Sequence, residues 1–323
     1  MQKMTEGRPS KLILKFALPM LAGNVLQQMY NLVDSLVVGN FVGKEALAAV
    51  GGTFILNFLL VSLFSGLGLG FTIVISQFFG SGKKDSIRSA VDTAYVVSVL
   101  GAIAVTVVGV ALVGPMLTAM NTPAGITREM SSSYLTIIFL GTIGSFGYNL
   151  NAGILQGLGD SVSSVTFLAV ATVLNIVLDL VFVVAFHWGV AGAAWATIIS
   201  QAISFIAGTV FIVRKLKLTR LDPRDLRFDP VILREAVRIG IPGGIQNALF
   251  SLGSMAIQRL VNGYGPVYMA GFSISSRIDS VAFMPIASFS SAITTYVGQN
   301  FGAGRLDRVK AGVRATQAMS AAI

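Results

Sequence analysis

Two copies of one sequence pattern follow each other along the chain, and this duplication constrains the fold more than any other feature. The segment LPMLAGN at residues 18–24 returns as IPGGIQN at residues 241–247, and SQFFGSGKKD at residues 76–85 returns as GQNFGAGRLD at residues 298–307. Solenoid repeats recur every ~20–50 residues, a much shorter period than the one found here. The duplication therefore predicts two related lobes, each formed by a long stretch of chain.

The second copy is much shorter than the first. Its last residue, Ile323, corresponds to Gly101 of the first copy, so only the beginning of its third apolar segment is present. We therefore expect this sequence to be a C-terminally truncated part of a longer protein with two lobes.

Composition places the chain in a lipid bilayer. Of its 323 residues, 54% are hydrophobic and only 11% are charged, whereas soluble domains carry about 25% charged residues. Segments of about 20 mainly apolar residues predict membrane-spanning helices, of which about eight and a half are present here. They lie near residues 12–38, 46–79, 90–117, 130–155, 162–186, 190–213, 236–261 and 268–297, and a ninth begins at about residue 309. The sequence thus predicts an all-α polytopic membrane protein.

The basic residues indicate how the chain is oriented in the membrane. Most of the 23 Lys and Arg flank alternate ends of the apolar segments, and the loops on the opposite side contain only Lys44 and Arg128. By the positive-inside rule, the N-terminus then faces the cytoplasm, in a multi-pass protein of the plasma (inner) membrane. The formal charge of +9 therefore reflects topology. We expect no nucleic-acid partner, because the basic clusters border apolar segments and have no aromatic stacking platform.

The apolar segments also predict the domain organisation. Six of them separate the start of the first copy from the start of the second, and an even number returns the chain to the same side, so we expect two parallel six-helix lobes. The first would comprise residues 1–213, a cytoplasmic linker residues 214–234, and the incomplete C-terminal lobe residues 235–323. Within the linker, Asp229 and Pro230 have the pattern of an N-cap and a first helical residue.

A stripe of polar residues runs along the first apolar segment, at Asn24, Gln27, Asn31 and Asp34. Spacings of three and four residues place these side chains on one face of a helix. A carboxylate near the middle of a bilayer costs at least ~2.5–3.5 kcal/mol, so Asp34 must face a cavity or a partner. We interpret Asp34 as functional. The alternatives are a polar contact between helices and a position close enough to the outer surface for water to reach the carboxylate.

Similar polar positions recur in the fifth and sixth apolar segments, at Thr172, Asn175, Asp179, Thr197, Gln201 and Ser204. Two carboxylates, an amide and a hydroxyl that converge would form an all-oxygen site suited to Na⁺. The same two carboxyl groups, at Asp34 and Asp179, could instead share a proton. The residues leave the choice between Na⁺ and H⁺ open.

The second copy differs from the first at these positions. The residue that corresponds to Asp34 is Ile257, and only a milder stripe remains. Candidates for a substrate cavity or for gating, drawn from both copies, are Gln27, Asn31, Asn247, Gln258, Arg277 and Asp279. Pro19 and Pro242 occupy equivalent positions in the two copies, so we interpret them as bending hinges.

Several motifs spread over the whole chain carry a family resemblance. They are NLVDSLVVGNFVG at residues 31–43, LQGLGDS at 155–161, NIVLDLVF at 175–182, GVAGAAWAT at 189–197, and the repeated proline and Gln-x-x-Gly-x-Gly segments. Together they resemble the multidrug and toxic compound extrusion (MATE) family. The resemblance implies a two-lobe, twelve-helix exporter driven by inward Na⁺ or H⁺. It also implies a cation site at the positions of Asp34, Asn175, Asp179 and Thr197.

Three functions follow as hypotheses. The first is a monomeric antiporter that exports small organic, often cationic, compounds in exchange for Na⁺ or H⁺. The second is a flippase of a lipid-linked sugar from the same superfamily, which would line its cavity with more basic residues than Arg259 and Arg277. The third is a receptor or scaffold, against which the buried acids argue. No Walker loop or metal-ligand cluster is present in the sequence, so we expect neither an enzyme nor a cofactor other than the coupling ion.

Overall fold

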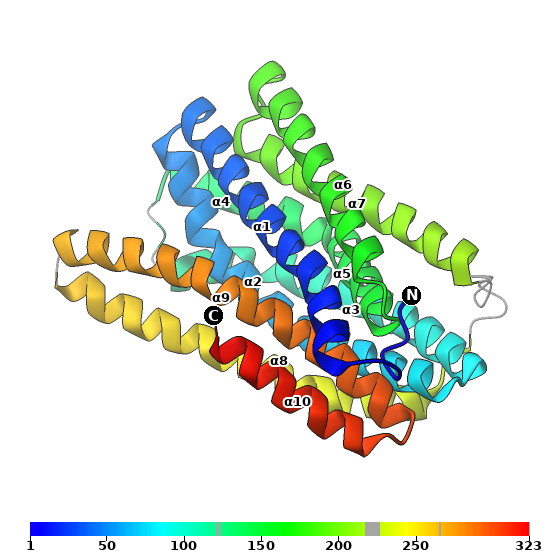
Figure 1. The fold of residues 1–323 in the computed structure, drawn as a ribbon. Coiled ribbons are helices and arrows are strands. Elements are labelled where there is room, and N and C mark those ends of the chain that lie inside the picture. The colour runs from blue at the N-terminus through cyan, green and yellow to red at the C-terminus, as the bar shows by residue number, and fades with distance from the viewer. Residues whose placement is uncertain (121, 123, 217–226, 265, 323) are drawn as a thin grey trace.

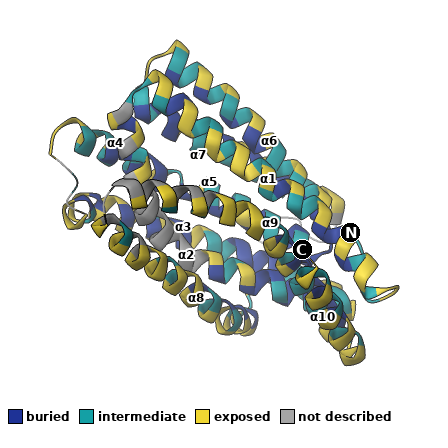
Figure 2. Ribbon diagram, turned by 60° about the vertical axis from the view of Figure 1, so that its left-hand side comes forward, coloured by how far each residue is buried: buried dark blue, intermediate teal, exposed yellow. Residues whose placement is uncertain are grey.

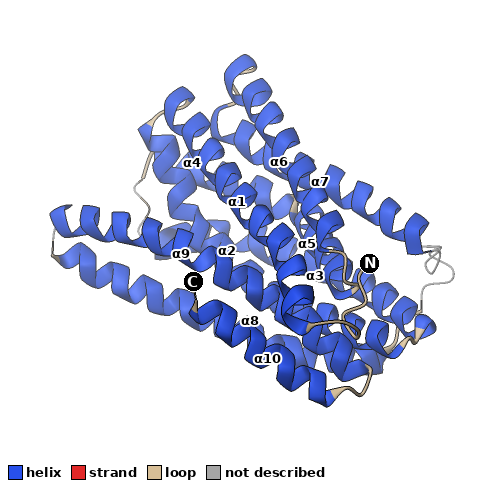
Figure 3. Ribbon diagram, viewed as in Figure 1, coloured by secondary structure: helices blue, strands red, loops and turns tan. Residues whose placement is uncertain are grey.

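The computed structural model describes residues 1–323 except residues 121, 123, 217–226, 265 and 323, and except the side chains of some further helical residues. In the described part of the chain every regular element is a helix (Figure 3). The elements are α1 (Pro9–Phe41), α2 (Lys44–Ser81), α3 (Lys84–Ala119), α4 (Ile126–Leu140), α5 (Thr142–Gly157), α6 (Ser161–Asp179), the π-helical turn η1 (Leu180–Ala185), α7 (Gly189–Leu216), α8 (Pro230–Gly263), α9 (Pro266–Gly302) and α10 (Leu306–Ala321). The all-α prediction is confirmed.

Four of the described helical segments are long and apolar enough to cross a membrane, judged by length and composition: α3, α6 with η1, α7, and residues 278–302 of α9. The bent pair α4–α5 adds a fifth if it counts as one span. Helices α1 and α8 contain the polar stripes, which lower their apolar content. The larger number of spans expected from the sequence therefore stays a prediction.

The fourth apolar segment is broken into two helices. Helices α4 and α5 meet at Gly141 with a bend of 53°. A Cβ atom at Gly141 would lie 2.2 Å from Cγ2 of Ile198 in α7. The joint thus approaches α7 so closely that only glycine fits, and the sequence periodicity had not predicted this break.

The fifth apolar segment changes its helical form directly after Asp179. Helix α6 ends there, and residues Leu180–Ala185 continue as a π-helical turn. The ring of Trp188 stacks on the ring of Phe182, with 4.9 Å between the ring centroids. The backbone N–H of Trp188 donates to the backbone carbonyl of Phe182 at 2.9 Å. These contacts close the turn between α6 and α7. Isolated π turns occur frequently at functional sites.

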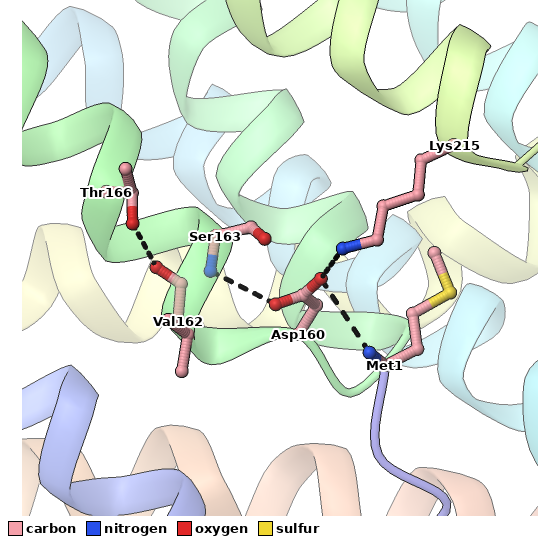
Figure 4. Close-up of polar contacts among 6 residues, drawn as sticks. All are labelled: Met1, Asp160, Val162, Ser163, Thr166 and Lys215. Atoms are coloured by element: carbon pink, nitrogen blue, oxygen red, sulfur yellow. Dashed lines mark hydrogen bonds and ion pairs between the residues drawn. The ribbon is translucent and has the colours of Figure 1, made fainter.

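Asp160 begins α6 and connects it to two other parts of the chain (Figure 4). Its Oδ1 accepts the backbone N–H of Ser163 at 3.0 Å, the usual N-cap bond. Its Oδ2 lies 3.2 Å from the Lys215 ammonium at the end of α7 and 3.8 Å from the amino group of Met1. The start of α6, the end of α7 and the N-terminal segment therefore meet at one carboxylate.

Helix α8 begins where the sequence predicted. Asp229 precedes Pro230, and its Oδ1 accepts the N–H groups of Val231 and Ile232 at 2.8 and 3.3 Å. The backbone N–H of Asp229 donates to Thr93 Oγ1 of α3 at 3.0 Å. The N-cap prediction is confirmed. Residues 217–226 of the predicted linker lie outside the described residues.

Helix α2 packs closely against α8, the first helix of the second copy. A Cβ atom at Gly66 would lie 2.4 Å from the Gly240 carbonyl oxygen, and one at Gly70 would lie 2.1 Å from that of Ala236. Glycine is therefore required at both positions. Small residues at a helix contact allow this close approach, as is common between membrane helices.

Helices α2 and α9 make a reciprocal contact through the repeated Gln-x-x-Gly motif. A Cβ atom at Gly80 would lie 1.9 Å from the Gln299 carbonyl oxygen, and one at Gly302 would lie 1.9 Å from that of Gln77. The motif in each copy thus packs on the motif in the other. Such an isologous contact is typical of elements related by a two-fold axis.

The end of the molecule at which this contact lies also contains residues Met1–Gly7 and the turns α5–α6 and α9–α10, and we call it the N-terminal end. In Figure 1 the α6–α7 and α8–α9 turns lie at separate corners, far from the N-terminus.

Figure 2 shows that α8 is largely exposed, whereas buried residues gather along α2, α3 and α5. Several large apolar side chains of α8 are exposed, among them Leu249, Leu260 and Phe250, the last by 79%, as expected for a surface that meets lipid or further protein.

Candidate cation site

The four residues predicted to bind a cation come together from three helices. Asp34 lies on α1, Asn175 and Asp179 lie on α6, and Thr197 lies on α7. Helix α6 packs against both α1 and α7, which brings the three polar faces into contact. Asn175 and Asp179 are both fully buried.

Asn175 connects α6 to α7. With its amide oriented to satisfy both neighbours, Asn175 donates from Nδ2 to Asp179 Oδ2 at 3.1 Å. Its Oδ1 accepts the backbone N–H of Thr197 at 3.3 Å. Asn175 therefore fixes the position of one Asp179 oxygen and leaves the other available.

Tyr30 brings α1 into the same network. Its hydroxyl lies 3.1 Å from Thr197 Oγ1, at hydrogen-bond distance. Tyr30 stands four residues before Asp34, and this spacing places the two side chains on one face of α1. The sequence analysis missed Tyr30, because a tyrosine in an apolar segment has no unusual composition. Its spacing from Asp34 was the available signal.

Two carboxyl oxygens in this network have no hydrogen-bond partner among the described residues: Asp34 Oδ1 and Asp179 Oδ1, both buried. The buried hydroxyl of Thr172, about one helical turn before Asn175 on α6, likewise has no partner in the described structure. The Asp34 and Asp179 carboxyls are near enough to interact electrostatically. Buried carboxylates of this kind require a cation or a proton.

The donor set fits a hard monovalent cation or a shared proton. No group of three or more His, Cys, Asp or Glu side chains that could hold a metal ion occurs among the described residues. A cation here would instead be held by two carboxyl groups together with amide, hydroxyl and backbone oxygens, which are hard oxygen ligands. Na⁺ and H⁺ remain equal candidates on this geometry.

The predicted cavity and gating residues lie on three helices, α1, α8 and α9. Gln27 and Asn31 on α1, Asn247 on α8 and Asp279 on α9 are all exposed. The side chains of Gln258 and Arg277 lie outside the described part of the structure. Asn24, the first residue of the α1 stripe, differs from the others because it donates to Ser288 Oγ of α9 at 3.0 Å.

Both predicted hinge residues lie inside helices, Pro19 in α1 and Pro242 in α8. Proline has no N–H, so each leaves one carbonyl of the preceding turn without its helical hydrogen bond. The two helices nevertheless run through these positions without interruption. A hinge role for the prolines stays a prediction.

A cavity of about 340 Å³ lies between α2, α3, α5 and α9. Its lining combines apolar side chains with uncharged polar ones, and none of the lining residues is charged. Polar members from α2, α5 and α9 include Thr72, Asn149, Gln156, Ser291 and Thr294. The sequence analysis had assigned none of these to a cavity, because single Ser, Thr or Asn residues are common in helix contacts.

Comparison with known proteins supports one family. The MatE family model matches residues 19–181 and 242–323, one segment in each copy of the repeat. The chain is 35% identical to the probable multidrug resistance protein YpnP of Bacillus subtilis (strain 168), over 94% of this chain and 68% of that protein. It is 31% identical to the probable multidrug resistance protein YoeA of the same organism, over 93% of this chain and 66% of that protein. The chain thus spans about two thirds of the length of these curated relatives.

The fold leads to the same family. The structure is similar to a solved one described as the outward-facing conformation of a multidrug resistance MATE family transporter of the MOP superfamily. The TM-score is 0.89 at 25% identity, over 97% of this chain and 69% of that one. Sequence and fold agree across both copies of the repeat, and the chain therefore belongs to the MatE family, that is, the MATE family of multi-pass membrane transporters.

Proposed function

We propose that the whole protein is a secondary antiporter that exports small organic compounds, often cationic drugs, in exchange for Na⁺ or H⁺. The observation that carries this proposal is the pair of buried carboxyl groups of Asp34 and Asp179, each with an oxygen that has no hydrogen-bond partner in the described chain. A cation or a proton would neutralise them, and its release would restore the charge. The similarity to YpnP, described as a probable multidrug resistance protein, supports export of drug-like compounds.

The proposal includes an arrangement in the membrane. The basic N-terminal end of the bundle would face the cytoplasm, as the positive-inside rule requires. Residues 1–213 would form a complete six-helix lobe, residues 214–234 a cytoplasmic linker, and residues 235–323 part of a parallel second lobe. Helices α1, α2 and α8 would then cross the membrane together with the apolar spans, and the polar stripes of α1 and α8 would face protein or cavity instead of lipid.

Coupling would run through α1. Asp34 and Pro19 both lie on this helix. Because proline cannot donate a helical hydrogen bond, α1 bends most easily near Pro19. A cation that binds one shape of α1 more tightly shifts the equilibrium between outward-open and inward-open arrangements of the lobes. Pro242 would give the second copy an equivalent hinge.

The substrate would be an uncharged or cationic organic molecule. The cavity of about 340 Å³ between α2, α3, α5 and α9 offers apolar surface with hydroxyl and amide groups and no charged lining residue. Such a lining does not favour the anionic head group that a lipid-linked sugar flippase would carry. We assign six polar residues of α1, α8 and α9 to the path between this cavity and water, namely Gln27, Asn31, Asn247, Gln258, Arg277 and Asp279.

Dye export from vesicles tests this function. The whole protein is reconstituted into liposomes loaded with ethidium, and an inward Na⁺ gradient and an inward H⁺ gradient are imposed in separate experiments. We expect one of the two gradients to drive ethidium export, while protein-free liposomes show none. Absence of export under both gradients overturns the proposed antiport.

A further inference from the structure

Residues Gln2–Gly7 precede α1 as a non-helical segment that lies across the N-terminal end of the molecule. The segment contacts the first lobe at the turn between α5 and α6. The Gln2 N–H donates to the Gly159 carbonyl at 2.9 Å. Gly159 has φ +77°, and a Cβ atom there would lie 2.3 Å from the Gln2 carbonyl oxygen, so only glycine accepts the segment at this distance.

The same segment is held more firmly by the second copy. The Met4 N–H donates to Gln299 Oε1 at 2.8 Å, and the Met4 carbonyl accepts from Asn300 Nδ2 at 3.1 Å and from Arg308 Nη2 at 3.2 Å. Arg308 Nη2 also donates to the Gly7 carbonyl at 2.9 Å. Both polar groups of the Met4 backbone are therefore bound by α9 and α10.

The side chain of Met4 adds an apolar anchor. It is fully buried and packs with Ile13 and Phe16 of α1 and with Tyr296 of α9. The ring of Tyr296 also lies under the Arg308 guanidinium, 5.9 Å from its centre. The segment thus occupies a formed site between α1, α9 and α10.

Gln299 connects the segment directly to the contact between the lobes. Its side chain is fully buried, accepts from the Met4 N–H, and donates from Nε2 to the Gly157 carbonyl of α5 at 3.4 Å. Its backbone carbonyl is the one that meets Gly80 of α2. One residue of α9 therefore touches the N-terminal segment and two helices of the first lobe.

We propose that residues Gln2–Gly7 are a latch that holds the two lobes together at the cytoplasmic end and must leave α9 and α10 before the transporter opens inward. This inference rests on the proposed alternating-access function. Opening at the cytoplasmic end separates α9 from α2, and the latch continues covalently into α1 of the first lobe. The bonds to Gln299, Asn300 and Arg308 are therefore the ones that break.

The test measures the distance between the lobes at the cytoplasmic end of the whole protein. Spin labels are attached to the cysteines of Lys84→Cys and Lys310→Cys, and both positions are exposed. The sequence of 323 residues contains no native cysteine that would also react. Arg308→Ala removes the guanidinium bonds to Met4, Gly7 and Asn300. We expect it to raise the long-distance, inward-open population by a factor of at least about ten, since the loss of a single hydrogen bond to a charged group already has this effect. The matched control is Arg314→Ala, which removes an exposed arginine from the same helix.

A second variant changes the N-terminal segment itself, at the buried side chain of Met4. Met4→Lys places a charge in the apolar site beside Arg308, and we expect the same increase in the long-distance population. Distance distributions that match the Arg314→Ala control in both variants overturn the latch. The distance readout is independent of export, so a protein that exports no dye yet shows these shifts retains the latch and contradicts only the antiport.

Discussion

At the scale of single residues, the two acids of the candidate site differ in their hydrogen bonds. Asn175 holds one oxygen of Asp179 in place, whereas no described side chain donates to Asp34 Oδ1. Asp34 also lies on the helix with the proposed hinge at Pro19. We infer that Asp179 belongs to the fixed part of the site and that Asp34 transmits cation binding to α1.

Asp34→Asn in the whole protein removes the titratable charge and keeps the shape of the side chain. We expect cation-driven dye export to fall by roughly 100-fold or more, with unchanged membrane insertion, because the energy source is lost. Export is measured in reconstituted vesicles. The control is Asp85→Asn, which alters an exposed acid in the first turn of α3. Wild-type export by Asp34→Asn would show that this carboxyl is structural.

Asn175→Ala tests the role of the connecting amide. The substitution removes the donor to Asp179 and the acceptor for the Thr197 N–H, so both groups lose their positions. We expect the cation concentration for half-maximal export to rise by a factor of at least about ten, since the loss of a single buried hydrogen bond already has an effect of this size. Asn40→Ala, at an exposed position near the end of α1, serves as the matched control. Equal half-maximal concentrations in the two variants would contradict the role of Asn175.

Helical spacing was enough to predict much of this site. Positions three and four residues apart singled out Asp34, Asn175, Asp179 and Thr197, and the structure places all four in contacting helices. Their role in cation binding stays a prediction. Spacing could not show that Asn31 is exposed while Asn24 binds α9, because that difference depends on which neighbour each turn of α1 meets.

At the scale of helices, contacts between elements decided what the sequence could not predict. Periodicity predicted one helix through residues 130–155, yet the chain bends by 53° at Gly141 where α7 comes close. The π-helical turn after Asp179 likewise depends on Phe182 and Trp188 meeting across the α6–α7 turn. The sequence correctly predicted features that depend only on neighbouring residues, such as the Asp229 N-cap at the start of α8.

Asp160 makes the start of α6 sensitive to pH. Burial alone would raise the pKa of this carboxyl, but the N–H of Ser163, the Lys215 ammonium and the Met1 amino group together lower the pKa below its ordinary value. A lowered pKa in the folded state stabilises the fold above the ordinary carboxyl pKa of about 3.9, and this contribution is lost as the pH falls through the lowered value.

Asp160→Asn should therefore lower the unfolding temperature of the whole protein in detergent at pH 7. The expected loss is below about 1 kcal/mol, since the Lys215 side chain is 45% exposed and water screens the ion pair. The difference between variant and wild type should shrink as the pH is lowered below about 4. Glu235→Gln, an exposed acid at the start of α8, is the control. A difference that stays constant down to acid pH would argue against the ion pairs.

At the scale of the whole molecule, the sequence repeat has a direct structural counterpart. The repeat aligns Gln77 with Gln299 and Gly80 with Gly302, and these four residues form the reciprocal contact between α2 and α9. The alignment indicated that the positions are equivalent. It could not indicate that they touch each other, because equivalent positions in two lobes meet only when they lie near the axis that relates the lobes.

Gly80→Ala tests whether this contact holds the lobes together. The new Cβ atom would lie 1.9 Å from the Gln299 carbonyl oxygen, and backbone atoms cannot move aside as a flexible side chain would. We expect α2 and α9 to be forced apart, with a loss of about 1–3 kcal/mol in unfolding free energy, measured by thermal unfolding of the whole protein in detergent. Because the contact is reciprocal, Gly302→Ala should cause a loss of similar size. The control is Gly114→Ala in α3, where nothing lies within 4 Å of the added atom and alanine favours the helix. If Gly80→Ala and Gly302→Ala both unfold at the temperature of this control, the two copies do not meet through their repeated motif.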